Sequence, residues 1–349
     1  MMIEIFDPKA LRGFTGAVLA KVGVPREAAD AVAEGLVEAD LYGHATHGLA
    51  LLPDYVEEIE NGTMAVEGRP QVVSDFGAIT LWDARRLPGV WTTKLAVAEA
   101  AARAKKFGVG AVTVHHSHHI ACLAAFLEEP ARAGKLALLF SSDPSDAHVA
   151  PFGGTTPVMT PNPVAAGIPA TPDPILIDVS TSITTAAMCG RARSENRPLP
   201  GKWLKDKHGD ATDDAFVMKD GGSILPIGGL DHGHKGYGLG LLVEALTQGL
   251  GGFGRADGPK DWGAAVLALV FEPAAFGGID AFVRQTGWLA DACRASDVPE
   301  GAPPVRLPGA AALARKAAAI AEGLPLDEAR LSGLRALSSR LSIPLPPAT

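Results

Sequence analysis

The sequence has few cysteines, no long apolar run and no excess of positive charge. Its three cysteines lie far apart without metal-binding spacing, which argues against a disulfide framework and favours a reducing compartment. No apolar run reaches membrane-spanning length, and the N-terminus lacks a signal-peptide pattern. The net charge of −8 argues against a surface for nucleic acid or anionic lipid. We therefore expect a cytoplasmic protein with no membrane or nucleic-acid partner.

Two common catalytic signatures are also missing. No G-x-G-x-x-G pattern follows an expected strand, so a standard dinucleotide-binding fold is not supported. No G-x-S-x-G elbow is present, and Cys122 lies among apolar residues that favour the core, so a nucleophilic triad is disfavoured. A chain of 349 residues is longer than one core usually serves, which predicts more than one lobe.

Apolar periodicity and turn residues predict an alternation of helices and strands. Helices are expected at 8–21, from Pro25 onward, and at 51–59, 92–106, 120–133, 237–250, 279–295, 309–321 and 326–341. Strands are expected at 78–82, 109–114, 136–140, 175–179 and 264–271. Because strand and helix alternate in the middle of the chain, parallel strand pairing is predicted.

Residues 39–55, ADLYGHATHGLALLPDY, place polar groups between apolar residues. Thr46 and His47 stand here between two glycines, which allow close approach of another backbone or a ligand. Histidine titrates closest to neutral pH, so His47 is a candidate proton donor or acceptor. The alternative is that His44 and His47 are ordinary surface or helix-end residues.

Further polar groups stand at the ends of apolar elements. Carboxyl ends of strands gather functional groups, so we expect the histidine run 115–119 and residues 141–143 to meet there. Asp178 at a strand end suits ribose hydroxyls, and Lys235 before a helix suits a phosphate or ribose. The alternatives are a turn or helix cap for Asp178 and a solvated cap for Lys235.

The histidine run also raises the possibility of a metal. Strand alternation would put His115, Ser117 and His119 on one face and His116 and His118 on the other. Zinc would need a further ligand. The candidates for it are Asp143, His148, His232 and His234. Because the spacing is not a recognised zinc signature, we predict no metal site.

Seven short motifs follow one another between about residues 40 and 245. They are D-L-Y-G-H-A-T-H-G, S-H-H-I, P-F-G-G, T-P-N-P, I-D-V-S-T-S, L-P-I-G-G and G-H-K-G-Y-G-L. In sequence and order they resemble the malate/L-lactate dehydrogenase family that lacks a Rossmann fold. The resemblance implies an α/β fold with a non-Rossmann mixed sheet flanked by helices. It implies that N-terminal residues 1–75 pack with C-terminal helices at 300–349. The cofactor-binding α/β domain is then 76–299, with a surface excursion at about 190–222.

The same resemblance implies a homodimeric oxidoreductase that transfers a hydride between NAD or NADP and a 2-oxo acid, a cyclic ketimine or a related compound. It implies that His47, beside Thr46, donates a proton to the substrate, and that His119 acts as an acid–base residue against the cofactor. The positions that match cofactor contacts are His119, Ser142, Asp178, Val179, Ser180, His234, Lys235 and, in a later loop, Arg306. The expected substrate positions are Thr160, Leu51 and Tyr55. A positioned imidazolium would neutralise the charge that hydride addition leaves on oxygen or nitrogen.

Two positions depart from the family pattern. Leu51 stands where the family commonly has an arginine for the substrate carboxylate, and no lysine or arginine occurs between Arg26 and Arg69. Met188 stands where the ketimine reductases have an acid that assists the histidine. We therefore expect a less anionic or bulkier substrate, or a carboxylate held by a residue from elsewhere, such as across the dimer.

Two functions of other classes stay open from the sequence. One is a metal-dependent hydrolase or lyase that uses the histidine cluster. The other is a catalytically inactive relative that keeps the fold as a binding module, given Leu51 and Met188.

Overall fold

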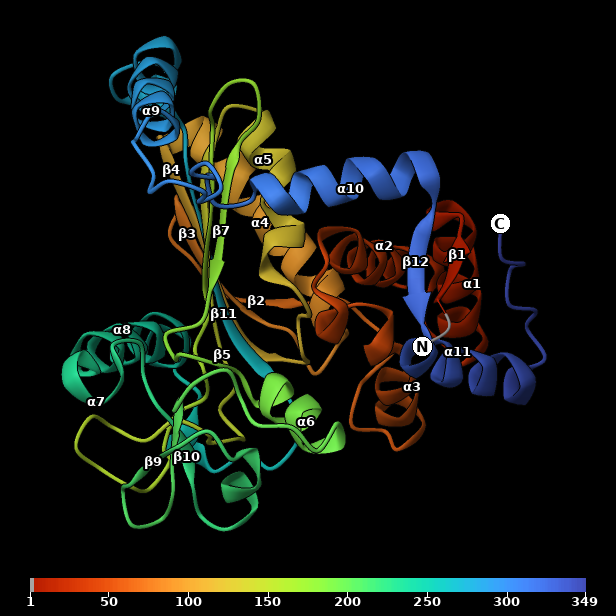
Figure 1. Cartoon of the computed structure of the whole chain (residues 1–349). Helices are drawn as coiled ribbons and strands as arrows, with labels where there is room; N and C mark the ends of the chain where they lie inside the picture. Colours follow the sequence, from red (N-terminus) through yellow and green to blue (C-terminus); the bar gives the residue numbers. More distant parts are fainter. Residues whose placement is uncertain (1–2) are drawn as a thin grey trace.

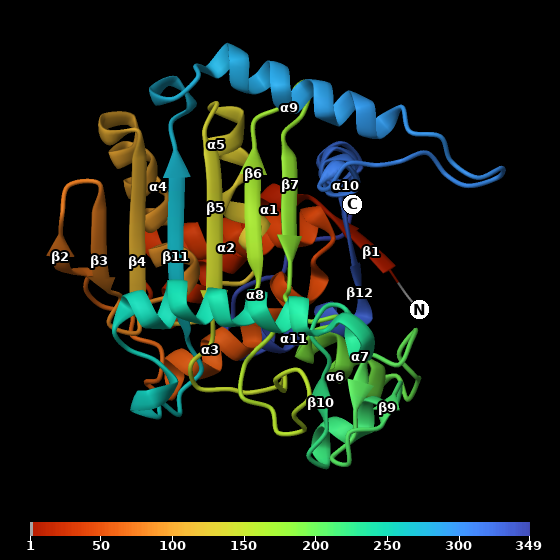
Figure 2. The ribbon, with the colours of Figure 1, turned by 90° about the vertical axis from the view of Figure 1, so that its left-hand side faces the viewer.

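A seven-stranded mixed sheet runs through the middle of the molecule (Figure 1). The structure, a computed structural model, describes residues 3–349. The strands follow the order β2-β3-β4-β11-β5-β6-β7, which Figure 2 shows face-on. Their bounds are β2 (Gln71–Asp75), β3 (Ile79–Asp83), β4 (Val109–Ser117), β5 (Leu136–Ser142), β6 (Val164–Ile168), β7 (Ile175–Val179) and β11 (Ala264–Phe271). The expected α/β class, a non-Rossmann mixed sheet flanked by helices, is confirmed.

The predicted parallel pairing is mostly wrong. Only β3 and β4 pair in parallel, and every other neighbouring pair of this sheet is antiparallel. The reason is that β11, from late in the chain, inserts between β4 and β5, and β6 reverses the chain between β5 and β7. Strands β3, β4, β5 and β7 nevertheless run in one direction, so their carboxyl ends still meet at one edge.

Helices from both ends of the chain pack together beside the sheet (Figure 1). They are α1 (Pro8–Lys21), α2 (Arg26–Tyr42), α3 (Leu52–Glu60), α10 (Ala310–Glu322) and α11 (Glu328–Leu341). Strands β1 (Ile3–Phe6) and β12 (Leu324–Asp327), which the sequence did not predict, pair antiparallel and tie the two ends together. Helix α1 begins where predicted because the Asp7 side chain accepts the Lys9 N–H.

Helix α4 (Gly89–Phe107) covers one face of the sheet, against β4 and β11. Helix α2 packs behind α4, and its predicted stripe, which includes Ala29, Val32 and Leu36, is fully buried. These contacts join the sheet and the terminal helices into one apolar core. The turn that follows α2 is thereby held at the edge where the strands end.

The helix expected at 120–133 is wrong. The chain instead forms η3 (Leu123–Phe126) and α5 (Glu128–Arg132), preceded by non-helical residues. Ala121 has a φ of +60°, which no α-helix accommodates, and the Asp178 carboxylate accepts the Ala124 N–H at 2.9 Å. The Ala124 N–H therefore donates to Asp178 of β7 and not to a carbonyl oxygen in a first helical turn.

A small lobe lies below the sheet edge (Figure 1). It contains α6 (Ala186–Ser194), η4 (Ala215–Lys219) and the three-stranded sheet β10-β8-β9. The strands are β8 (Leu204–Lys205), β9 (Ala211–Thr212) and β10 (Ser223–Ile224). Its own buried cluster includes Cys189, Leu204 and Ile224, so this segment has a core and is more than a surface loop.

The other face of the sheet is crossed by α8 (His234–Glu244) at one end and α9 (Ile279–Arg294) at the other (Figure 2). The remaining elements are η1 (Ala45–His47), η2 (Leu49–Leu51), α7 (Gly229–His232), η5 (Ala245–Gly249), η6 (Arg255–Asp257) and η7 (Pro273–Ala275). No helix within residues 3–349 is long and apolar enough to cross a membrane.

Candidate active site

A cavity of about 720 Å³ opens at the edge where β4, β5 and β7 end. Its walls come from segments that are far apart in the sequence. They include His44, Thr46, His47, Leu51, His119, Cys122, Ser142, Thr160, Asn162, Asp178, Val179, Ser180 and Trp262. A smaller hollow of about 360 Å³ lies between α5 and α10, but its cations Arg132 and Lys316 are already paired with acids. The larger cavity is therefore the candidate site.

A buried ion pair holds the turn that carries His47. Asp40, at 4% exposure, accepts the Leu49 N–H at 2.7 Å and pairs with Arg330 of α11 at 2.8 Å. Burial raises the pKa of Asp40 to about 6, and the Leu49 N–H and Arg330 oppose that rise. A Cβ on Gly48 would lie 2.4 Å from the Asp40 carboxylate, so only glycine allows this approach. No local sequence pattern predicts the contact with Arg330, because this residue lies 290 positions from Asp40.

His47 lies in this turn with a hydroxyl beside it. Its Nδ1 is 3.0 Å from Thr46 Oγ1, and its ring centroid is 6.0 Å from that of His119. Burial lowers the pKa of His47, the Asp178 charge raises it in part, and His44 lowers it. Once protonated, His47 is therefore a stronger acid than a solvated histidine, which suits a proton donor.

His119 is held between an aromatic ring and a hydroxyl. It stacks on Trp262 at a centroid distance of 4.5 Å, and Tyr55 Oη lies 2.9 Å from its Nδ1. The Ala121 N–H also points to this Nδ1, at 3.4 Å, and a backbone N–H can only donate. The neutral ring therefore carries its proton on Nε2. Burial, and then the nearby His47 and His118, hold the pKa of His119 well below the ordinary value.

The predicted alternation of the histidine run is wrong. His116 has a φ of +49° and the ladder to β11 shifts register opposite it, so the pleat breaks. The rings of His115 and His116 consequently stack on each other with centroids 4.5 Å apart. His118 points elsewhere, with no exposed surface and its Nε2 3.1 Å from Glu58.

Two groups of His, Cys, Asp and Glu within residues 3–349 have ligand atoms close enough to share a metal ion. One is His44, Cys122 and Asp178, and the other is Asp83, His115 and His116. The further ligands considered from the sequence belong to neither group. Metal-capable side chains therefore occur at the cavity, but in a combination that sequence spacing did not predict.

The predicted cofactor residues of the sheet edge reach the cavity. Ser142 Oγ lies 2.7 Å from Thr247 Oγ1 and accepts from Gln248 Nε2 at 3.0 Å. Thr160 donates to Asn162 at 2.8 Å, and Asp178 and Ser180 follow along the same wall. Each hydroxyl is oriented by a neighbour, so this wall offers fixed polar groups to a ligand.

Other predicted residues lie outside the cavity lining. Tyr55 is buried behind His119, and His234, Lys235 and Arg306 are exposed on α8 and on the loop before α10. Their roles toward cofactor or substrate stay predictions. Met188 also lies outside the lining, two residues beyond Ala186, which does line the cavity.

Trp262 is the main residue that sequence reasoning missed. It lies two residues before β11, whose amino end meets the carboxyl ends of β4 and β5 because the pairing is antiparallel. The sequence predicted the strand at 264–271, and Trp262 lies just before it. Trp262 can be recognised as a site residue only when the antiparallel pairing of that strand is known.

Comparison with known proteins finds relatives over nearly the whole chain. Residues 6–335 match the family model described as malate/L-lactate dehydrogenase. An L-lactate dehydrogenase of Cupriavidus necator is 32% identical, covering 95% of this chain and 96% of the relative. A (2R)-3-sulfolactate dehydrogenase (NADP(+)) of Chromohalobacter salexigens is 34% identical, covering 92% of this chain and 94% of the relative.

Solved structures are similar over the whole chain. Malate dehydrogenase from Entamoeba histolytica has a TM-score of 0.93 at 22% identity, covering 99% of this chain and 100% of that one. Delta1-piperideine-2-carboxylate reductase from Pseudomonas syringae pvar. tomato has a TM-score of 0.83 at 26% identity, covering 96% and 99%. The first similarity supports the fold alone.

Proposed function

Since the chain belongs to the malate/L-lactate dehydrogenase family, we propose that it transfers a hydride between NAD or NADP and a 2-oxo acid, a cyclic ketimine or a related compound. The chain is a dehydrogenase of this family, and its relatives act on hydroxy or oxo acids by name. One observation carries the finer proposal. His47 and His119 line the same cavity as Ser142 and Asp178, so a proton donor and a polar wall share one site.

The cavity fits a nicotinamide nucleotide in its chemistry. Asp178 and the hydroxyls of Ser142 and Ser180 suit ribose and amide groups, while Trp262 and Leu123 give apolar wall. When bound, the nicotinamide supplies or accepts the hydride. The residues that would hold it are His119, Ser142, Asp178, Val179 and Ser180.

His47 is the proposed proton donor. Its lowered pKa makes the imidazolium a stronger acid than that of a solvated histidine, and Thr46 at its Nδ1 fixes the ring direction. His119, neutral with its proton on Nε2, is suited to donate a hydrogen bond to the carbonyl or imine that takes up the proton.

The residues that line the cavity limit which substrates can bind. Among the described residues that line it there is no lysine or arginine, and Leu51 puts an alkyl group on the wall. A substrate carboxylate would lose its hydration here without a lysine or arginine to pair with. We therefore propose a less anionic or bulkier substrate than a simple 2-oxo acid, unless a partner subunit supplies the cation.

A reduction screen tests this proposal. Purified protein is assayed with NADH and NADPH against matched pairs, each a 2-oxo acid or cyclic ketimine acid and its amide. We expect turnover, with kcat/KM for the amide at least equal to that for the acid. Pyruvate or oxaloacetate, the oxo acids that correspond to lactate and malate, as the best substrate would refute the substrate proposal. Cofactor binding without turnover over the panel would favour the inactive relative, and activity that requires stoichiometric zinc would favour the hydrolase or lyase.

A single substitution sharpens the substrate proposal. Leu51→Arg places a guanidinium on the cavity wall and should raise kcat/KM for each acid relative to its amide. Roughly tenfold is expected from one charge-assisted pair. Leu52→Met, at the neighbouring buried position, is the matched control and should leave the ratio unchanged. An unchanged ratio in Leu51→Arg would show that the carboxylate position lies elsewhere.

We propose that two copies pair through the sheet face between α8 and α9. Large apolar side chains are exposed at its margins, among them Leu239 and Leu242 on α8 and Trp288 on α9, each at least 48% exposed. Figure 2 shows no element within residues 3–349 crossing the middle of that face. Large apolar side chains exposed on one face of a protein are typical of an interface between copies.

We also propose that the protein works in the reducing cytoplasm. The three cysteines are all free, which fits such a compartment.

Sedimentation measures the proposed pairing. The wild type should sediment as a dimer, and Leu242→Asp should shift it toward monomer. Ile320→Asp, an exposed isoleucine on α10, is the control and should stay dimeric. If Ile320→Asp dissociates the dimer and Leu242→Asp does not, the interface lies on the other side of the molecule.

A further inference from the structure

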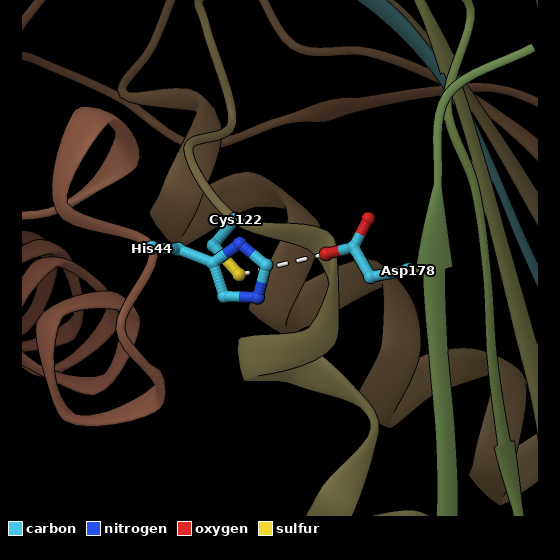
Figure 3. Close-up of side chains that lie close together, drawn as sticks. All are labelled: His44, Cys122 and Asp178. Atoms are coloured by element: carbon cyan, nitrogen blue, oxygen red, sulfur yellow. Dashed lines mark hydrogen bonds between the residues drawn. The ribbon is translucent and has the colours of Figure 1, made fainter. Parts of the chain in front are cut away.

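Three side chains from separate segments converge at one point of the cavity wall (Figure 3). His44 precedes η1, Cys122 precedes η3, and Asp178 stands near the end of β7. Their nitrogen, sulfur and oxygen ligand atoms all lie within 4.8 Å of one another. Neither the family motifs nor the proposed hydride transfer uses this combination of donor atoms.

The separations are close to those of a tetrahedral metal site. Zinc bonds of about 2.0–2.3 Å put ligand atoms about 3.3–3.8 Å apart in a tetrahedron. Cys122 Sγ and Asp178 Oδ2 are already 3.5 Å apart. The His44 ring needs to move by roughly 1 Å at most to reach that range. It is half-exposed, and none of the hydrogen bonds among residues 3–349 restrains it, so this movement is easy.

The surroundings favour a cation with affinity for sulfur. Imidazole, thiolate and carboxylate together suit Zn²⁺ and other late divalent metals better than Mg²⁺ or Ca²⁺. The lining of the cavity lacks lysine and arginine among the described residues, so no fixed cation repels the metal. Because three side chains supply three ligands, a fourth position stays available for a water molecule or another ligand.

We propose that His44, Cys122 and Asp178 bind one Zn²⁺ or a similar late divalent cation, and that the bound ion blocks the cavity. Binding forms a bond from the Cys122 sulfur to the metal and releases the thiol proton to solvent, with no change of oxidation state. The ion then occupies Asp178, which holds the cofactor in the proposed function. Only the inhibitory consequence rests on that proposed function.

Cobalt is the probe for the binding step. Co²⁺ takes the same ligands as Zn²⁺, and a thiolate ligand gives it a charge-transfer absorption band. Wild type should develop this band to one Co²⁺ per chain, and added Zn²⁺ should remove it. Cys122→Ser should lack the band, and Cys293→Ser, a cysteine on α9 outside the cavity, should keep it.

Further variants separate this site from the other metal-capable group. His44→Gln should weaken Co²⁺ binding by more than about tenfold while the fold is retained. His116→Gln should leave the band unchanged, because Asp83, His115 and His116 contain no thiol. A missing band in the wild type, or one that persists in Cys122→Ser, would overturn the proposed site.

An activity measurement tests the inhibitory consequence separately. Zn²⁺ should inhibit turnover competitively with the nicotinamide cofactor, and a chelator should restore it. Turnover of Cys122→Ser, whatever its level, should be less sensitive to Zn²⁺ by more than about tenfold. A cobalt band without inhibition would support the metal site and contradict the cofactor position at Asp178. Activation by stoichiometric zinc would overturn the blocking role.

Discussion

His116, near the start of the histidine run 115–119, and His119, at its end, have the same side chain in different surroundings. His119 lies against Trp262 and Tyr55 in the cavity, with a pKa well below the ordinary value because it is buried. His116, three residues earlier, is half-exposed, lies 3.2 Å from Asp83 and packs on Phe253. The difference shows that residue type suggests candidate residues for a site. Burial and fixed partners then determine which histidine is suited to acid–base chemistry.

The sharpest test of this contrast is to remove the proposed donor and its counterpart. His47→Gln should lower kcat by about 10²–10⁴, the usual contribution of a general acid. His116→Gln should keep kcat within about twofold, because His116 lies outside the cavity lining. Steady-state kinetics measure both. Equal losses in the two variants would contradict the assignment of acid–base chemistry to the histidines that line the cavity.

A close backbone contact positions the cavity end of the run. A Cβ on Gly89 would lie 2.0 Å from the His118 carbonyl oxygen and 2.5 Å from that of His119. Gly89→Ala should therefore cost roughly 2–4 kcal/mol of unfolding free energy and displace His119. Gly13→Ala, where nothing lies within 4 Å, should change stability by less than about 1 kcal/mol and on the stabilising side. Urea unfolding of both variants decides, and equal stabilities would contradict the close contact.

The third test uses the buried neighbour of the run. Burial lowers the pKa of His118 to about 4, against an unfolded value of about 6.5. The unfolded chain then binds more protons between these values, so stability should fall as pH drops from 6.5 to 4. The loss attributable to this group is at most about 3 kcal/mol. His118→Gln should flatten this part of the profile.

A matched variant completes the pH experiment. His116→Gln keeps His118 and should retain the wild-type loss between pH 6.5 and 4. Thermal unfolding across the pH range measures the slopes. A steep slope that survives in His118→Gln would assign the loss to other groups.

The smallest expected effect concerns the hydroxyl behind His119. Tyr55→Phe removes the Oη that lies 2.9 Å from Nδ1 and should lower kcat/KM by about five- to tenfold. The hydroxyl stabilises the neutral ring, so its loss should move the acidic limb of the pH–rate profile to higher pH. Tyr42→Phe removes a hydroxyl that is bonded to Glu128 and should leave that limb in place. If the acidic limb of the pH–rate profile does not move in Tyr55→Phe, Tyr55 only packs against His119 and does not influence its pKa.

Sequence patterns located the strand ends but not the contacts between distant segments. His47, Ser142 and Asp178 were predicted as site residues because each stands at the end of an apolar element and the carboxyl ends of same-direction strands meet. All three line the cavity. The argument from strand ends holds although the predicted strand pairing is wrong. Strand β11 lies between β4 and β5 and is antiparallel to both, so these two strands still run in the same direction.

What sequence reasoning missed depends on partners far along the chain. Arg330 reaches Asp40 across 290 residues, and Trp262 reaches His119 only because β11 inserts into the sheet. The left-handed φ of His116 has no signal in a residue type that rarely adopts it. Local periodicity therefore predicts elements, while the site's supporting contacts require the folded chain.

Equilibrium titration with NADH and NADPH tests the central claim most directly, namely that this cavity holds a nicotinamide cofactor. Cofactor fluorescence is followed for wild type, for Asp178→Asn in the cavity wall, and for Asp173→Asn, two residues before β7 begins. We predict saturable binding of one cofactor per wild-type chain, weakened roughly tenfold or more by Asp178→Asn and unchanged by Asp173→Asn. Absence of saturable binding for both cofactors, or equal binding by all three proteins, would contradict the claim.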